Sequence, residues 1–94
     1  MDQENKQTIL DEAKTIVEGS RQADYGSPVE GFELIAKLAS LITGKDLTPD
    51  DCCSVLIAVK LSRETFNHKR DNLVDLCGYA YILNEIKDSK DKGE

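Results

Sequence analysis

The segment from Lys60 to Tyr79 contains the side chains of this sequence that are best suited to bind a ligand. Lys60 and Arg63 lie one turn apart near the end of one predicted helix. Asp71 and Asp75 lie one turn apart at the start of the next helix. Residues three or four positions apart share a helix face, so the two cations form one surface and the two carboxylates form another. The short connection makes the helices antiparallel neighbours, and we expect these charges and Tyr79 to converge on one small site.

The predicted pairing of Asp75 with Lys60 or Arg63 has two interpretations. Asp75 lies in mid-helix between two apolar residues, and a carboxylate that faces inward there must be paired or neutralised. In the structural interpretation, one of these two cations pairs with Asp75 and only joins the two helices. In the functional interpretation, the same pair also holds the cations ready for a phosphate group.

Two further groups of residues flank this segment. Arg21 and Tyr25 precede the second predicted helix, where they are candidates for a phosphate ligand and a stacking platform for a base. The alternative is a chain reversal at Tyr25-Gly26 with a packed ring. Lys69 and Arg70 lie just before a helix N-terminus, whose free N–H groups favour anions. The alternative for these two charges is simple solvation in a polar turn.

Gly78 lies inside a predicted helix, where glycine costs about 1 kcal/mol relative to alanine. A close helix crossing is the favoured reason for it, and room for a ligand beside Tyr79 is the alternative. Tyr79 and Tyr81 point to different faces, so we expect at most one of them in the core. His68 is isolated in the turn and is expected to be a surface histidine rather than a general base.

Glu30 and Glu33 form an E-x2-E step, a spacing at which two carboxylates on one helix can share a divalent ion. Mg²⁺ usually takes one or two carboxylates together with substrate phosphates. Glu30 is also explained as part of a capping box with Ser27. No E-x2-D step follows on the next predicted helix, so this ligand set for a metal is incomplete.

Hydrophobic periodicity predicts an all-α, four-helix bundle-like single domain over residues 1–94, with no strand, internal repeat or domain boundary. A core of this size would gain stability from oligomer contacts. The third helix is apolar almost all round and is expected to be the buried central one. The predicted helices cover residues 6–18, 28–43, 49–67 and 71–88, and a charged, frayed tail covers 89–94.

The composition restricts the class of protein. A net charge of −6 argues against bulk nucleic-acid binding, which needs a basic surface. No apolar run reaches about 18 residues, so no membrane span is expected. The polar N-terminus argues against a signal peptide, and a cytoplasmic location is predicted. The three cysteines are expected to be buried free thiols, and a single histidine argues against a zinc site.

The spacing of these residues resembles a small helical family of phage and prophage proteins, over about Ile9 to Ile86. The matching pattern is Arg21-x3-Tyr25-Gly26-x-Pro28-x3-Phe32, Lys60-x2-Arg63 and Asp71-x3-Asp75-x2-Gly78-Tyr79. Its second half looks like the phage nucleotide-modification-associated domains, which are similar to MazG-like nucleoside triphosphate pyrophosphohydrolases. The resemblance to that wider family implies a helical bundle, a dimer or larger assembly, and Mg²⁺ held by E-x2-E and E-x2-D steps. The sequence departs from these acidic steps, because its third predicted helix ends in Lys60 and Arg63 and its fourth carries Asp71-x3-Asp75.

We therefore expect a phage-type protein that binds a small phosphorylated nucleotide in the host cytoplasm, as a homo-oligomer and without a metal cofactor. Sequestering a nucleotide immune signal of the host, an anti-defence role, is one use of such binding. The alternative is a Mg²⁺-dependent MazG-like pyrophosphohydrolase with Glu30, Glu33, Asp71 and Asp75 as ligands. A third hypothesis is a purely structural bundle in which Lys60 and Asp75 only clamp two helices.

Overall fold

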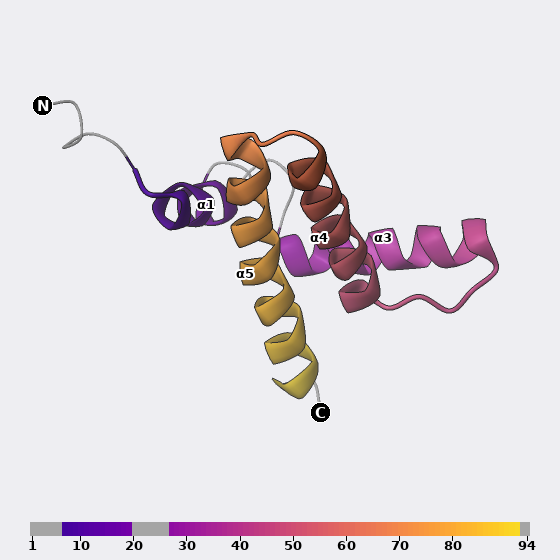
Figure 1. The fold of residues 1–94 in the computed structure, drawn as a ribbon. Helices are drawn as coiled ribbons and strands as arrows, with labels where there is room; N and C mark the ends of the chain where they lie inside the picture. The colour runs from indigo at the N-terminus through magenta and orange to yellow at the C-terminus, as the bar shows by residue number, and fades with distance from the viewer. Residues whose placement is uncertain (1–6, 20–26, 93–94) are drawn as a thin grey trace, which may run out of the picture.

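The computed structural model describes residues 7–19 and 27–92, which form four helices (Figure 1). These described residues contain no strand, so the prediction of a four-helix, all-α domain is confirmed. None of the helices in these ranges has the length and the apolar composition needed to cross a membrane. The helices are α1 (Ile9–Glu18), α3 (Pro28–Thr43), α4 (Pro49–Phe66) and α5 (Arg70–Lys92).

Side-chain caps begin three of the helices. Thr8, Ser27 and Thr48 each accept a hydrogen bond from the backbone N–H three residues later, at 3.0–3.1 Å. At α4 the capping box is complete, because Asp51 accepts a bond from the Thr48 N–H at 3.0 Å. The capping box predicted for Glu30 is wrong: within the described residues its carboxylate returns no bond to Ser27. The Thr8 cap also places the start of α1 at Ile9 rather than residue 6.

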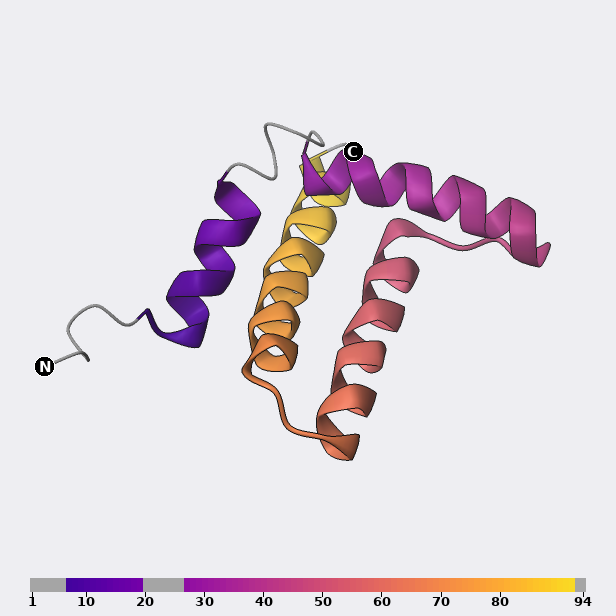
Figure 2. The same cartoon turned by 90° about the horizontal axis from the view of Figure 1, so that it is seen from above.

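The α5 helix is the central one, which corrects the prediction that the third helix would be. It lies between α1 and α4, and α3 crosses beside them (Figure 2). No described helix covers the outer face of α4, so Val55 is 61% exposed and Phe66 is 92% exposed. A helix that is apolar nearly all round is therefore half uncovered in the single chain.

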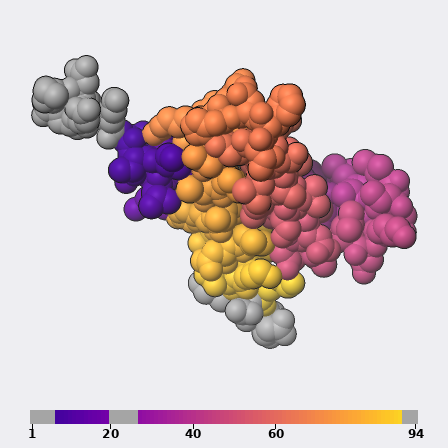
Figure 3. All heavy atoms as spheres, in the orientation of Figure 1, coloured from indigo at the N-terminus to yellow at the C-terminus, as the bar shows by residue number. Residues whose placement is uncertain are grey.

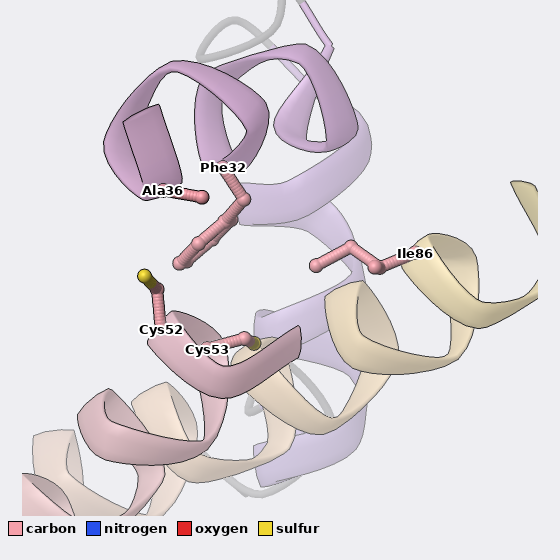
Figure 4. Close-up of a cluster of buried hydrophobic side chains, with 5 residues drawn as sticks. All are labelled: Phe32, Ala36, Cys52, Cys53 and Ile86. Carbon is pink, nitrogen blue, oxygen red and sulfur yellow. The ribbon is translucent and has the colours of Figure 1, made fainter. Parts of the chain in front are cut away.

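The main hydrophobic cluster joins α3, α4 and α5 (Figure 4). Its buried members are Phe32, Ala36, Cys52, Cys53 and Ile86. Burial of Phe32 or Ile86 contributes about 1.5–3 kcal/mol each. The Cys53 thiol donates a hydrogen bond to the backbone carbonyl of residue 79 at 3.3 Å, and burial raises its pKa to about 11. All three cysteines are free, and the third of them, Cys77, is only half-buried.

Glu64 organises the turn between α4 and α5. Its carboxylate accepts hydrogen bonds from the Lys69 backbone N–H at 3.2 Å and from the side chain of Asn72 at 3.1 Å. It also contacts His68, and this contact is the main reason that the Glu64 pKa is lowered. Asn72 is buried, so these bonds satisfy a polar group that would otherwise destabilise the core. His68 is exposed, as the sequence predicts.

The C-terminal part of α5 is held against the start of α4. Lys87 and Lys90 lie 3.2 Å and 3.6 Å from a carboxylate oxygen of Asp50. The helix therefore continues to Lys92, whereas the sequence places its end at residue 88. The Thr48 side chain lowers the pKa of Asp50 most, and burial partly opposes this effect. With the two ammonium groups added, the Asp50 pKa falls to about 2.

Replacing the Asp50 carboxylate should make the free energy of unfolding less dependent on pH between about pH 4 and 2. An unfolded aspartate titrates near pH 4, so the Asp50 stabilisation is complete above about pH 4 and is lost as the pH falls toward 2. We expect Asp50→Asn to lower the free energy of unfolding by about 2 kcal/mol at pH 7. Urea denaturation at pH 7, 4 and 2.5 measures the difference. Asp46→Asn, at an exposed carboxylate, is the control. A deficit in Asp50→Asn that is equally large at pH 2.5 contradicts this account.

Candidate functional site

A cavity of about 440 Å³ lies where the four helices meet. Its walls are mostly apolar, and its polar side chains are Ser27, Asp75 and Tyr79. Asp75 is 39% exposed, so solvent reaches this side of the cavity. The apolar lining comes from Ala13, Ile16 and Val17 of α1, Pro28, Phe32 and Ile35 of α3, Leu56 of α4, and Val74 and Ile82 of α5.

Tyr79 forms one wall of this cavity. Its ring packs edge-to-face with Phe32, with centroids 6.5 Å apart and planes at 87°. It is half-buried, and its hydroxyl has no hydrogen-bond partner in the described part of the chain. Tyr81, on another face of α5, instead donates a hydrogen bond to Glu18, which is the main cause of its raised pKa. Of the two tyrosines in the described ranges, Tyr79 is thus the one available to a ligand.

Gly78 lies beside this wall, where α5 meets α1. A Cβ atom placed on it would lie 3.6 Å from Cγ2 of Val17, an ordinary van der Waals contact. The crossing of the two helices therefore does not require glycine, contrary to the explanation favoured from the sequence. Gly78 also lines the cavity, so the missing side chain leaves space there.

Lys60 and Asp75 form the predicted ion pair at the edge of the cavity. The Lys60 Nζ atom lies 2.7 Å from Oδ2 of Asp75, and the lysine side chain is 17% exposed. An ammonium group has three N–H donors, and among the described residues Lys60 uses one of them on this carboxylate. The cation is therefore held in place with donors to spare.

The other predicted charges on these helices do not line the cavity. Arg63 is exposed and makes no ion pair within the described ranges. Arg70 contacts the Glu12 carboxylate of α1 and donates to the Gln7 backbone carbonyl at 2.9 Å. Lys69 and Asp71 are exposed. Of the predicted group, the structure thus brings Asp75 and Tyr79 to the cavity, and Lys60 lies next to it through its pair with Asp75.

Two predicted ligand residues, Arg21 and Tyr25, lie outside the described residues. Ser27, the first described residue after them, lines the cavity. Its hydroxyl accepts the capping bond from the Glu30 N–H at 3.1 Å and keeps its own proton free to donate. The sequence predicted Ser27 only as a helix cap and did not indicate that it also lines the cavity.

The predicted metal ligands Glu30 and Glu33 are exposed on the first turns of α3 and do not line the cavity. The described ranges contain no cluster of three or more histidine, cysteine, aspartate or glutamate residues arranged to hold a metal. The sequence also did not indicate the contribution of α1 to the cavity. Its residues there are apolar and at helical spacing, which indicates a buried face but not what that face encloses.

Comparison with known proteins identifies a family and a phage relative of the chain. Residues 8–87 match DUF6378, described as a domain of unknown function. The chain is also 33% identical over 89 residues to the "Gene 55 protein" of Mycobacterium phage D29. This similarity covers 94% of the chain and 59% of the phage protein, so the chain spans about six tenths of that relative's length. No solved structure matches the chain significantly. The predicted resemblance to a small phage protein family is confirmed.

The two cations on α4 should differ in their effect on stability. Lys60→Met leaves Asp75 without its partner, and we expect it to lower the free energy of unfolding by about 1 kcal/mol. Arg63→Ala removes an exposed side chain without an ion pair in the described structure, and should change it by less than about 0.5 kcal/mol. Chemical denaturation of both variants measures this. Equal losses in the two variants would argue against the observed pairing.

Proposed function

The chain belongs to the DUF6378 family, and from this premise we propose that it binds a phosphorylated nucleotide. The observation that carries this proposal is an apolar, ligand-sized cavity with an aromatic wall and a held cation at its edge. The base would occupy the cavity, and the phosphate would lie outside it on the basic end of α4. Lys60, Arg63, Asp75 and Tyr79 are the residues to which this proposal assigns roles.

The dimensions and chemistry of the cavity support the base position. Its volume of about 440 Å³ lies within the ordinary range of small-molecule sites, roughly 300–1,000 Å³. A nucleobase has two apolar faces, and stacking on an aromatic ring contributes about 1–3 kcal/mol per base. Tyr79 supplies the ring, and the Ser27 hydroxyl supplies a polar group for the edge of the base.

The charges at the edge of the cavity support the phosphate position. Asp75 holds the Lys60 ammonium in place, and two N–H donors of that ammonium are unused by described residues. Arg63 lies one helical turn further along α4, exposed, and its guanidinium is suited to bidentate contacts with phosphate. These local cations would act against the repulsion that a chain of net charge −6 exerts on an anion.

The proposed use is binding without turnover by a homo-oligomer, so that a phage protein removes a nucleotide immune signal of its host from solution. The family relationship with a phage protein supports this setting. Arg21 and Tyr25 remain candidate ligand residues in this proposal.

Calorimetry without metal tests the binding. We expect one class among mononucleotides, cyclic dinucleotides and ADP-ribose derivatives to bind, and Arg63→Ala to weaken that binding by about tenfold or more without changing stability. Lys14→Ala, at an exposed cation of α1 outside the cavity, is the control and should bind as the wild type does. An absence of binding across the whole panel rejects the proposal.

A second variant in this assay distinguishes the effect of lost cavity space on binding from an effect of lowered stability. Gly78→Ala should raise the free energy of unfolding by about 0.5–1 kcal/mol, since alanine is the better helix former. It should also weaken nucleotide binding, because its methyl group takes up cavity space. Asn84→Ala, on the exposed side of the same helix, should raise stability and leave binding unchanged.

The resemblance to MazG-like enzymes supplies a second candidate, a Mg²⁺-dependent nucleotide pyrophosphohydrolase. The observation that favours it is that Glu30 and Glu33 are exposed one turn apart and form no ion pair with any described residue. Carboxylates so placed are free to bind Mg²⁺ together with water and the phosphates of a substrate. Asp71 and Asp75 would then act from a second subunit.

This candidate predicts pyrophosphate release from deoxynucleoside triphosphates in the presence of Mg²⁺. Glu33→Gln should lower the rate by about tenfold or more, because a neutral amide is a poorer Mg²⁺ ligand. Glu85→Gln, at an exposed carboxylate of α5, serves as the control. If the purified chain shows no turnover, or if Glu33→Gln is as active as the wild type, the enzyme hypothesis fails.

A further inference from the structure

The α3 helix is apolar on two sides, and only one of them is buried. Phe32 and Ala36 face the core. On the opposite side, five large aliphatic side chains form a band roughly 120° wide at 3.6 residues per turn. We call this band the α3 stripe: Leu34 (58% exposed), Ile35 (42%), Leu38 (50%), Leu41 (81%) and Ile42 (84%).

The order of residues in the α3 stripe is symmetric about Leu38. Two members lie three and four positions before Leu38, and two lie three and four positions after it. All five are leucine or isoleucine. A surface that reads the same in both directions along a helix complements an antiparallel copy of itself, which is the requirement for a two-fold interface.

We propose that the α3 stripe binds the α3 stripe of a second copy of this chain. The two helices lie antiparallel, with the two-fold axis passing at Leu38, so that Leu38 meets the partner's Leu38. In this register Leu34 lies beside the partner's Ile42, and Ile35 lies beside the partner's Leu41. Every large apolar side chain of the α3 stripe is then covered by one of similar size.

The exposure of the α3 stripe supplies the driving force for such an interface. Its five members are 42–84% exposed in the single chain. Removal of apolar surface from water is the dominant favourable contribution to most protein–protein association, so pairing of two such bands is favourable.

Charge and position also favour a second copy as the occupant. The α3 stripe contains no charged residue, so two copies can meet there without placing like charges opposite each other. Nucleic acid and anionic lipid surfaces are bound through cations, which the α3 stripe lacks. The C-terminal half of α3 stands out from the other helices (Figure 3), which leaves room for another helix to approach. Contiguous apolar bands of this kind on soluble chains mark interaction sites.

Light scattering coupled to size-exclusion chromatography tests the proposal. We expect the wild type to have twice the chain mass of 10.4 kDa. Leu38→Glu should raise the dissociation constant by about a hundredfold or more, because two carboxylates would meet on the axis. Leu61→Glu is the matched control, since Leu61 is also a 50% exposed leucine but lies on α4. It should leave the dimer intact.

Mixing two monomeric variants tests the register. Leu38→Lys should also be monomeric alone, whereas a mixture of Leu38→Glu and Leu38→Lys should restore a dimer, because only on the axis does position 38 meet itself. Circular dichroism checks that each variant is folded, and Ile42→Glu is a second disruptive variant at a more exposed position. A monomeric wild type overturns the proposal and leaves the α3 stripe to a different protein. A dimer that survives both glutamate variants overturns it as well.

Discussion

Burial of α5 against the other three helices is the interaction on which the rest of the structure depends. Ile86 and Val74 of α5 are 1% and 2% exposed, and they meet side chains from α1, α3 and α4. The three partners hardly contact one another apart from α3 with α4. Loss of the α5 contacts would therefore separate α1 from the domain, and the cavity would disappear, since α5 supplies five of its lining residues.

Ionic contacts add to this apolar packing at the edges of α5. Lys60 pairs with Asp75, Arg70 contacts Glu12, and Lys87 and Lys90 reach a single carboxylate at the start of α4. Partly exposed pairs contribute little stability individually, so the buried apolar area dominates. The pairs nevertheless link α5 to both α1 and α4 along its length. They therefore fix the position of the Lys60 ammonium relative to the cavity wall on α5.

The candidate site and the α3 stripe share a residue. Ile35 lines the cavity and is also 42% exposed as part of the α3 stripe. A helix from a second copy would therefore lie next to the cavity, and nucleotide binding and pairing would both depend on this side chain. Sequence reasoning predicted an oligomer from the small size of the core and from the family resemblance, without indicating a surface for it. The exposed fractions on α3 are the observation from which we propose a surface for it.

The sequence alone determined that the chain forms four helices and where two of their caps lie, and it limited the partner of Asp75 to two cations. A cap such as Ser27 or Thr48, or the left-handed Gly44 that ends α3, acts within about four residues, so a local pattern is sufficient. The short turn likewise places both Lys60 and Arg63 near Asp75, and the structure shows that Lys60 is the one that pairs with it. Only the tertiary structure decided that α5 is central, that Arg70 meets a glutamate 58 residues away, and that a cavity lies beside Gly78. These features depend on how four apolar faces pack together, and periodicity shows that a face is apolar without showing what covers it.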